Sequence, residues 1–411
     1  MRLALINEFY PPDFAPTGKL AASLAQHRAN LGDQVTIIAA RGGYVPESPV
    51  QSSNRTPNLR VIRLWTPRLG KKTLLARIVD YGWFFVMVAV RMAILGRQDV
   101  VIAMTTPPFI GLAGALHKRL HRGTKLVLWN MDSYPEAPER AGVISPTKIV
   151  SRAMRGLNRR LDRELDHVVC LDNAMQRLLS GRYPQEDSKV PMSVINNWEP
   201  AAGFPADGTP PPSETAMSLG LEGRFVLLYI GNAGFGHRFE TIIEATERLR
   251  DEPMSLLFVG GGERWNWLRR AKEERGLQNL HLHRYVPEPE ARSMLAMADC
   301  ALVTLRDSYL GVISPSKIHA SLAMGLPLIY VGPEGGNVDE AIQRFKCGVS
   351  LRNGDVDGLV AFIRQMMAEP AHLNALKIRA RQGYEAAYSD ATALPKLDRL
   401  LEGLVEGTHP A

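Results

Sequence analysis

Short apolar runs alternate with amphipathic stretches throughout the first half of the chain. The runs have the length of strands, and the segments after several of them repeat apolar positions every three to four residues, as amphipathic helices do. The runs are residues 3–6, 35–39, 61–64, 100–103, 126–128 and 168–171, and helices are expected at 19–31, 108–120 and 147–165. This alternation predicts a mainly parallel sheet covered by helices on both faces.

The second half repeats the same plan. Strands are expected at 225–230, 255–259, 280–282, 300–303, 326–331 and 348–351, and helices at 239–250, 263–275, 289–297, 317–324 and 338–343. Residues 199–221 carry five prolines and several glycines, a composition typical of a linker. The sequence therefore predicts an α/β protein with two doubly wound parallel-sheet domains at 1–199 and 222–384, joined by a linker at 200–221 and facing a cleft. A helix over about residues 385–411 is expected to pack back on the first domain.

Composition narrows the class of protein. The chain has 411 residues, of which 45% are apolar and 22% are charged, so it is globular rather than disordered or fibrous. Its net charge of +7 suits a phosphorylated, membrane-bound or nucleic-acid partner, but Lys and Arg are scattered, so the charge alone decides nothing. The three cysteines, Cys170, Cys300 and Cys347, lie far apart in apolar settings and are expected to be buried, reduced thiols.

Two hydrophobic segments bear on the membrane. Residues 1–6 are too short for the apolar region of a signal peptide and are expected to form the first strand. Residues 81–95 form the most hydrophobic stretch, but they contain Arg91 and fall short of the roughly 18 to 20 residues that a spanning helix needs. We expect most of this stretch to be buried, and the basic edge before it to touch an anionic bilayer, through Arg68, Lys71, Lys72 and Arg77.

A glycine-rich turn follows the strand expected at 225–230. Its glycines leave room for the backbone to approach a ligand, and polar side chains flank them; these residues are Gly231, Asn232, Gly234, Gly236, His237 and Arg238. Backbone N–H groups at the start of a helix are suited to an anion such as phosphate. A tight turn that binds nothing is the alternative, and this turn alone does not decide between them.

A second turn with a possible anion site lies later in the same half of the chain. Pro315 suits a first helical position, and Ser316 and Lys317 follow it at the start of the helix expected at 317–324. A cation at a helix N-terminus is electrostatically unfavourable by itself. An anion bound between the terminus and Lys317 would make the interaction favourable. The alternative is a solvated lysine. Two such turns in one domain predict a diphosphate held from two sides.

The third glycine-rich turn, at Gly260, Gly261 and Gly262, lacks the GxGxxG spacing of a dinucleotide site. A structural role and a position beside a ribose both remain open for it.

In the first half, residues 7–19 form a long loop that opens a helix near Thr17 and Gly18, and residues 129–136 bring Asp132 and Glu136 to the same edge of the sheet. These carboxylates could position a hydroxyl or act as a base, although a solvated or helix-capping carboxylate is the better interpretation of Glu136. His27 and His117 are expected to be structural. The sequence contains no metal-ligand motif and no acyl-transfer triad.

Taken in order, several segments resemble the bacterial family-four glycosyltransferases, which have the GT-B architecture of two facing Rossmann-like domains. More narrowly, the chain resembles the subgroup that includes L-fucosamine transferases of O-antigen and capsule assembly. The resemblance covers nearly the whole chain and rests on residues 9–12, 132–136, 194–198, 229–234 with His237, 258–262, 315–317 and 325–327.

The resemblance implies a retaining, hexosyltransferase-like enzyme with an N-terminal acceptor domain and a C-terminal nucleotide-sugar domain. The donor is expected to be a UDP-sugar, and the acceptor a polyprenyl-diphosphate-linked or other saccharide at the cytoplasmic face of the membrane. No metal is expected, because fixed cations neutralise the diphosphate. The expected catalytic residues are Asp132, Lys317 and His237, and the expected donor-binding residues are Gly231, Asn232, Gly234, Arg238, Gly261, Ser316, Thr17 and Gly18.

The chain departs from the broader family at three places. The family carries Arg and Lys in the first phosphate turn, where this chain has Asn232 and His237. It has two glutamates eight residues apart, where this chain has Val312 and Ala320. A histidine commonly precedes the aspartate, where this chain has Met131. The narrower subgroup often shows the Pro-Ser-Lys pattern without the second glutamate, so activity is still expected.

Two other interpretations stay open. A nucleotide-sugar 2-epimerase shares the architecture but would need paired acidic and histidine residues, of which the sequence shows no convincing set. A catalytically degenerate nucleotide-sugar-binding subunit is compatible with the missing glutamates. Nucleic-acid binding is the least favoured, because no basic stripe with interleaved aromatic residues is present.

Overall fold

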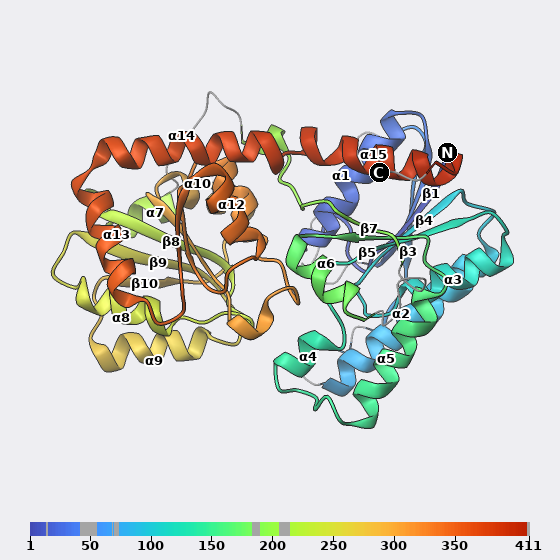
Figure 1. Cartoon of the computed structure of the whole chain (residues 1–411), viewed down its shortest axis with the longest axis horizontal. Helices are drawn as coiled ribbons and strands as arrows, with labels where there is room; N and C mark the ends of the chain where they lie inside the picture. Colours follow the sequence, from blue (N-terminus) through green and yellow to red (C-terminus); the bar gives the residue numbers. More distant parts are fainter. Residues whose placement is uncertain are drawn as a thin grey trace. The chain divides into compact units, whose positions relative to one another are not determined.

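The computed structural model describes residues 1–13, 15–41, 56–67, 69, 74–182, 190–204 and 214–408. The chain divides into two compact units (Figure 1). Unit 1 comprises Met1–Leu171, Met175–Ile195 and Leu394–Ala411, and unit 2 comprises Asp172–Ala174 and Asn196–Ala393. The linker expected at 200–221 lies in unit 2 where it is described, and residues 205–213 fall outside the described part.

Unit 1 is built on a parallel sheet whose strand order is β3-β2-β1-β4-β5-β6-β7. The strands are β1 (Arg2–Ile6), β2 (Gln34–Ala40), β3 (Leu59–Leu64), β4 (Val100–Met104), β5 (Lys125–Trp129), β6 (His167–Cys170) and β7 (Met192–Val194). The helices are α1 (Pro16–Asn30), α2 (Leu74–Ile94), α3 (Gly111–Leu120), α4 (Glu136–Arg140), α5 (Ile149–Asp162) and α6 (Asn173–Ser180). Strand β7 was not predicted, because three residues are too few to show a period.

Unit 2 has a parallel sheet with the order β10-β9-β8-β11-β12-β13. The strands are β8 (Phe225–Asn232), β9 (Met254–Gly261), β10 (Leu280–His283), β11 (Cys300–Thr304), β12 (Leu328–Val331) and β13 (Gly348–Leu351). The helices are α7 (Glu214–Ser218), α8 (Glu240–Arg248), α9 (Trp265–Arg275), α10 (Glu288–Ala296), α11 (Lys317–Ala323), α12 (Asn337–Phe345), α13 (Val356–Ala368) and α14 (Pro370–Ala387). The two doubly wound parallel sheets confirm the predicted fold class.

Helices cover both faces of the unit 2 sheet, with α8 and α9 on one side and α10 and α12 on the other (Figure 1). The core against α8 and α9 is aromatic: Tyr229 stacks on Phe258 at a ring distance of 4.7 Å, and Phe239 meets the Tyr229 ring edge-on at 5.0 Å. Tyr229 lies on β8 three residues before its end, so this packing fixes the position of the loop that follows.

The last helix, α15 (Asp390–Glu406), begins in unit 2 and continues into unit 1. Within unit 1 its acidic residues contact α1: Asp398 accepts hydrogen bonds from His27 at 2.7 Å and Arg28 at 2.8 Å, and Glu402 contacts Arg28 at 2.9 Å. These contacts tie the C-terminal segment to the first sheet. They also give His27 a structural role.

Residues 81–94 of the hydrophobic segment lie in α2, which is buried on one side only. Phe84, Val88 and Met92 are buried, whereas Trp83 and Val90 are exposed. The expectation that most of this stretch is buried is therefore wrong, because α2 packs against the sheet and α3 through a single face. Arg68, Lys71 and Lys72 and the side chain of Arg77 lie outside the described residues. No described helix is long and apolar enough to span a bilayer.

The three cysteines are free and buried, as expected. His117 is buried too, and its Nδ1–H donates to the carbonyl of Met92 at 2.8 Å, which joins α3 to α2. Burial lowers the pKa of His117, so the ring is neutral and structural.

Candidate functional site

Backbone approaches backbone closely where β8 and β9 end. Gly231 has a φ of 124° and Gly260 a φ of 146°, which is the region that favours glycine. A Cβ on Gly260 would lie 2.1 Å from the carbonyl oxygen of Gly231, and one on Gly262 would lie 2.2 Å from Oδ1 of Asn232. The glycines at 260 and 262 are thus required by packing, which gives this turn a structural role. A ribose-adjacent role for Gly261 stays a prediction.

Lys317 extends from the first residue of α11 to this glycine loop. Its Cε lies 3.2 Å from the position of a Cβ on Gly231, its Nζ lies 3.2 Å from Nε2 of His237, and the amine sits over the ring of Tyr229 at 4.9 Å. Burial lowers the pKa of Lys317 to about 7. Among the described residues, no carboxylate forms an ion pair with Lys317. The amine is therefore a cation site whose counter-charge the described residues do not supply.

His237 is held in one tautomer. Its ring Nδ1 lies 2.8 Å from the carbonyl oxygen of Thr304, which can only accept, so Nδ1 carries the proton. The other nitrogen, Nε2, then accepts from Lys317. Burial, and then the positive charge of Lys317, hold the pKa of His237 well below its usual value, so the imidazole is neutral. The neutral imidazole of His237 orients the Lys317 amine and leaves the positive charge of the amine available to a bound anion.

The remaining loop residues are held less tightly. Asn232 is exposed, its Nδ2 lies 3.3 Å from the position of a Cβ on Gly234, and its Oδ1 accepts a hydrogen bond of 3.4 Å from Tyr285. Gly261 contacts Tyr285 as well, since a Cβ there would lie 2.9 Å from the tyrosine ring. An exposed aromatic ring beside an exposed amide forms a surface that a flat polar ring could contact.

Arg238 and Ser316, also predicted to bind the donor, are both exposed. Arg238 is exposed, and its nearest ionic partner is Glu240 at 3.6 Å. Ser316 is the exposed residue before α11, and its side chain makes no capping hydrogen bond. Helix α11 begins at Lys317, so Pro315 lies before the helix and not at its first position.

Arg306 was missed by the sequence analysis. Its backbone N–H donates to Gly236 at 2.8 Å and its Nε donates to the carbonyl of His237 at 3.2 Å, so it braces the glycine loop. Tyr229 and Thr304 were missed as well. The signal available was their position in or at the end of an apolar strand, which is too common to single out a residue.

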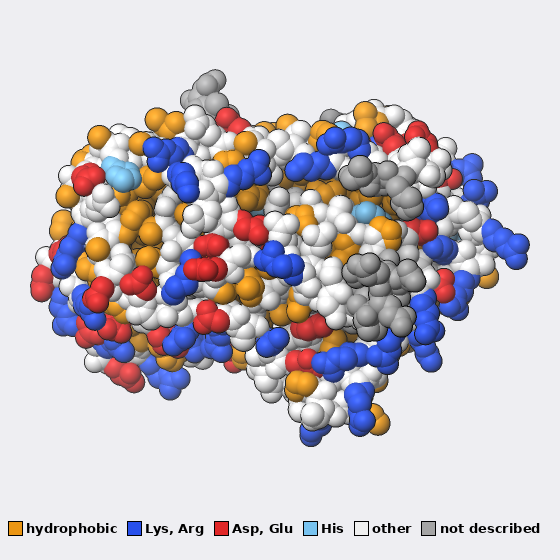
Figure 2. All heavy atoms as spheres, in the orientation of Figure 1, with side chains coloured by type: hydrophobic (Ala, Val, Ile, Leu, Met, Phe, Trp, Pro, Cys, Tyr) orange, Lys and Arg blue, Asp and Glu red, His pale blue; other side chains and the backbone are white. Residues whose placement is uncertain are grey.

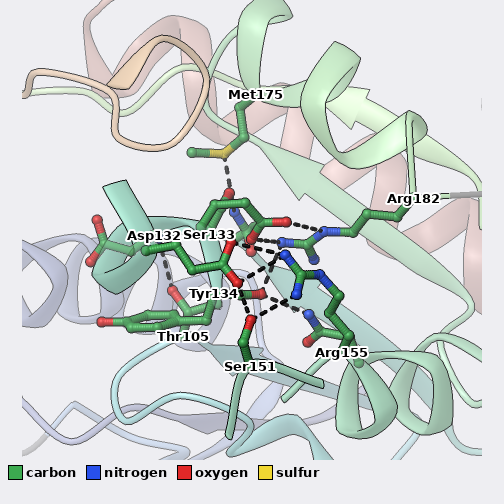
Figure 3. Close-up of polar contacts among 12 residues, drawn as sticks. Thr105, Asp132, Ser133, Tyr134, Ser151, Arg155, Met175 and Arg182 are labelled. Atoms are coloured by element: carbon green, nitrogen blue, oxygen red, sulfur yellow. Dashed lines mark hydrogen bonds and ion pairs between the residues drawn. The ribbon is translucent and has the colours of Figure 1, made fainter. Parts of the chain in front are cut away.

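The carboxyl edge of the unit 1 sheet carries Asp132. The hydroxyl of Thr105, just after β4, accepts hydrogen bonds from the backbone N–H groups of Met131 and Asp132, both at 3.0 Å (Figure 3). These bonds fix the backbone after β5. Burial raises the pKa of Asp132 to about 6, and burial, then the charge of Asp132, raises the pKa of Tyr134. An acid whose pKa lies near neutrality can hold or release a proton at physiological pH.

Glu136 is an ion-pair partner and not part of this acidic site. Arg182 contacts both of its carboxylate oxygens, at 3.2 Å and 2.6 Å, and also donates to the carbonyl of Tyr134 at 3.0 Å (Figure 3). Arg155 pairs with Glu139 at 2.8 Å in the same way. These two pairs anchor the segment that follows Asp132.

Thr17 and Gly18 lie in the first turn of α1, where the sequence placed a helix start. Asn7 donates to the Thr17 hydroxyl at 3.3 Å and to the carbonyl of Phe9 at 2.7 Å, and a Cβ on Gly18 would lie 3.3 Å from the backbone of Phe9 and Tyr10. The Oδ1 atom of Asn7 is buried without a hydrogen bond. The loop after β1 is therefore folded tightly onto α1.

The structure thus brings Gly231, His237 and Lys317 together in unit 2, with Asn232, Gly234 and Gly261 close by. Thr17, Gly18 and Asp132 lie in unit 1. Within the described ranges, no three His, Cys, Asp or Glu side chains are grouped as a metal site.

Two family models match this chain. A glycosyl transferase 4-like domain matches residues 17–198, and a model of glycosyl transferases group 1 matches residues 224–369. Together they span most of both units. The chain belongs to the bacterial family-four glycosyltransferases.

Relatives and solved structures agree with this assignment. The chain is 26% identical to a probable glycosyltransferase, WbjE, of Pseudomonas aeruginosa, over 80% of this chain and 81% of that one. It is 24% identical to a putative colanic acid biosynthesis glycosyl transferase, WcaI, of Escherichia coli K12, over 90% and 93%. It shares its fold with Anabaena Alr3699/HepE in complex with UDP-glucose, with a TM-score of 0.71 at 14% identity over 98% and 100% of the two chains. The fold is GT-B.

Proposed function

We propose that this glycosyltransferase moves a sugar from a nucleotide-diphosphate donor, a UDP-sugar, to an acceptor hydroxyl with retention of anomeric configuration. One observation carries the proposal: the amine of Lys317 lies 3.2 Å from a neutral His237, beside a glycine loop, with no described carboxylate as its ion-pair partner. A diphosphate would supply the missing negative charge. The UDP-glucose bound to the Anabaena protein of the same fold supports the choice of donor.

The barrier in such a reaction is largely departure of the diphosphate, which leaves an oxocarbenium-like sugar. Groups already oriented towards the leaving oxygens therefore supply the main catalytic effect. We assign Lys317 and the amides near Ser316 to the distal phosphate. His237, Asn232, Gly234 and the amides of Gly231–Gly236 face the other side, with Arg238 and Gly261 nearby.

Asp132 is assigned to the transferred sugar or the acceptor. Its pKa of about 6 allows it to accept a hydrogen bond from a sugar hydroxyl when ionised and to take up a proton in the same pH range. Thr17 and Gly18, in the first turn of α1, contact the loop that follows β1 at the same edge of the unit 1 sheet.

The acceptor is proposed to be a polyprenyl-diphosphate-linked or other saccharide in cell-surface polysaccharide assembly, as in O-antigen or capsule synthesis. The name of the Escherichia coli relative refers to colanic acid, which supports a polysaccharide product. Transfer of L-fucosamine, a cytoplasmic location with contact to the inner leaflet, and catalysis without a metal ion belong to the same proposal.

A panel of nucleotide diphosphates and UDP-sugars, tested by thermal shift, examines the donor site directly. Ligands that bind the folded state raise Tm, and UDP and UDP-sugars should give the largest shifts. Lys317→Ala should abolish the shift, while the exposed Lys396→Ala should keep it. Equal shifts in both variants would contradict the assignment of Lys317.

The chemical step is tested by incubating donor with and without acceptor. Release of UDP together with a free or transferred sugar supports a transferase and argues against a degenerate binding subunit. Conversion of the donor sugar to its 2-epimer would show the epimerase instead. Full activity in the presence of a chelator is the result expected for metal-independent catalysis.

A further inference from the structure

Helix α2 carries an apolar face that the rest of unit 1 leaves exposed. Five side chains on it are between 40% and 69% exposed: Val79, Trp83, Val86, Val90 and Ile94. Their spacing places them within an arc of about 80° on a helix that turns about 100° per residue. They form one continuous surface, which we call the α2 stripe.

The α2 stripe is the opposite face from the one that packs inward, where Phe84, Val88 and Met92 are buried. A helix on the surface of a soluble domain normally presents charged residues outward. Among the described side chains of α2, every exposed position carries an apolar residue or glycine. An uninterrupted apolar face of this kind marks an interaction surface.

A tryptophan pair extends the stripe. Trp65, which follows β3, is more than half exposed and meets Trp83 edge-on at a ring distance of 5.5 Å. Tryptophan prefers sites where an apolar body meets a wet surface, such as the interface of a bilayer.

Arginines lie on the neighbouring helix α5. Arg152, Arg159, Arg160 and Arg163 are exposed on or just after it, and none of them forms an ion pair with a described residue. Figure 2 shows Lys and Arg side chains gathered over the part of unit 1 where α3 and α5 lie in Figure 1. This face has cations in excess of their acidic partners.

Helix α3 joins the two features. It contacts α2 through His117 and Met92. It also packs against α5, and its Arg119 forms an ion pair of 2.6 Å with Glu164, just after the end of α5. Its exposed residues Leu116 and Leu120 continue the apolar surface between the stripe and the arginines.

A groove of about 390 Å³ lies between α3 and α5. Its apolar lining comes from Leu112, Ala115 and Leu116, and its charged lining consists of three arginines and one glutamate: Arg119, Arg160, Arg163 and Glu164. A groove with an apolar wall and cationic rim suits a molecule that has an acidic head and an apolar tail.

We infer that the α2 stripe and the arginine-lined groove between α3 and α5 together form a surface that docks unit 1 onto an anionic lipid bilayer. The stripe enters the boundary between headgroups and acyl chains, with α2 lying in the plane of the interface, and the arginines contact lipid phosphates. The inference gives the membrane contact in the proposed function a defined surface. It does not depend on donor binding in unit 2.

Charge favours a bilayer over a second copy of the chain. A symmetric dimer through this face would bury the same patch on both copies and bring the two sets of arginines towards each other. An anionic lipid surface instead complements them. A bilayer can bind the apolar stripe and the arginines at the same time, whereas a dimer would bury the stripe at the cost of repulsion between the arginines.

Vesicle flotation of the full-length protein tests the inference. Vesicles of phosphatidylcholine alone are compared with vesicles that also contain phosphatidylglycerol, at low and at high salt. We expect strong binding to the anionic vesicles, weaker binding at high salt and little binding to phosphatidylcholine alone.

Two double variants separate the contributions. Val86→Asp with Val90→Asp should weaken partitioning about ten-fold or more, because it places charges where apolar side chains enter the interface. Arg160→Gln with Arg163→Gln should weaken it about five-fold per arginine, or roughly 25-fold together, at low salt only. All four positions are exposed, so folding should be retained.

Matched controls carry the same changes on unit 2. Ile378→Asp removes an exposed isoleucine of α14, and Arg269→Gln with Arg270→Gln neutralises exposed arginines of α9. These controls should bind vesicles as the unmodified protein does. The UDP-induced Tm shift should persist in every variant, so a failure of membrane docking is distinguished from a failure of the proposed donor site.

Three results would overturn the inference. One is absence of the unmodified protein from floated anionic vesicles. Another is equal weakening by the unit 2 controls. The third is a dimer in light scattering that Val86→Asp with Val90→Asp converts to a monomer, with no vesicle binding by either, because a second copy would then cover the stripe.

Discussion

The two units share the order of their first six strands, but the side chains at the carboxyl edges of their sheets differ: a lysine in unit 2 and an aspartate in unit 1. Strands β1 and β4 of unit 1 occupy the places that β8 and β11 occupy in unit 2. After β8 and β11 the chain presents the amine of Lys317 beside a glycine loop, whereas unit 1 presents Asp132 after β5, with its backbone N–H held by the Thr105 hydroxyl. In the proposed function, the same scaffold therefore binds a diphosphate in one unit and a sugar hydroxyl in the other.

The means of construction differ as well. In unit 2 the strand ends approach so closely that Gly260 and Gly262 have no room for a side chain. In unit 1 the loops after β1 and β5 are held by side chains, through the bonds that Asn7 and Thr105 make to backbone groups. In the proposed function, the diphosphate contacts bare backbone in unit 2. In unit 1 the backbone that carries the Asp132 carboxylate is instead fixed by polar side chains.

The largest effect is expected from Lys317→Ala. Loss of one charge-stabilising donor typically lowers kcat by about 10² to 10³. Steady-state kinetics with a UDP-sugar donor would measure this loss. Lys317→Met, which keeps the length of the side chain, should lose as much, because the charge and not the packing is decisive.

The control is Lys396→Ala, which removes an exposed lysine of α15 and should leave kcat unchanged. Unaltered circular dichroism and Tm would show that the Lys317 variants are folded. If Lys317→Met turns over near the unmodified level, the charge of Lys317 does not matter for catalysis, and the proposed electrostatic difference between the units is contradicted.

Gly260→Ala should disrupt the donor unit itself. The new Cβ would meet the Gly231 carbonyl at 2.1 Å, and the φ of 146° is strained for alanine, so we expect a loss of about 3 kcal/mol or more in the free energy of unfolding. Gly276→Ala is the matched control, because Gly276 also has a positive φ but nothing lies near its Cβ position. It should cost about 1 kcal/mol. Equal losses in urea unfolding would show that packing at Gly260 is unimportant.

Asp132→Asn tests the acidic side of the comparison, with an expected fall of about 10² in kcat. The pKa of about 6 predicts that kcat of the unmodified enzyme falls as the pH drops below about 6, because the carboxylate becomes protonated. The variant should lose this limb of the pH–rate profile. A limb that persists in the variant would assign it to another group.

Asp132→Asn should lower kcat but raise the stability of the folded protein. The pKa of Asp132 is raised on folding, so the ionised carboxylate destabilises the folded state above that pKa, and the effect disappears as the pH falls to the unfolded value. Asp132→Asn should therefore raise Tm at alkaline pH and change it little in acid. A lower Tm at alkaline pH would mean that Asp132 stabilises the fold.

The smallest effect concerns the pH dependence of donor affinity. Since the pKa of Lys317 is about 7, its charge is lost as the pH rises, and the Kd for UDP-glucose should increase about ten-fold from about pH 6 to about pH 8. Titration calorimetry would measure it. Lys317→Met should bind weakly at both pH values with no such change, and an equal slope in that variant would contradict the assignment.

The sequence predicted much of the fold, because the apolar runs of a parallel sheet are continuous and the helices between them are amphipathic. Each run expected as a strand lies in or overlaps a strand of the structure. The pairing of Lys317 with the glycine loop was also foreseen, since parallel strands bring their carboxyl ends to one edge.

Other features could not be predicted. The neutral tautomer of His237 depends on the carbonyl of Thr304, which lies 67 residues away along the chain. The exposed face of α2 was missed because a helix that is apolar all round shows no period, so the sequence cannot say which side is buried. The ion pair of Glu136 with Arg182 likewise joins segments that no local pattern connects.

A crystal structure of the protein soaked with UDP tests the central claim most directly. We expect both phosphates between the Gly231–Gly236 loop and α11, with the distal phosphate about 3 Å from the Lys317 amine, a hydrogen-bonding distance. Phosphates bound elsewhere, or an empty loop with Lys317 still directed at His237 under saturating UDP, would contradict it.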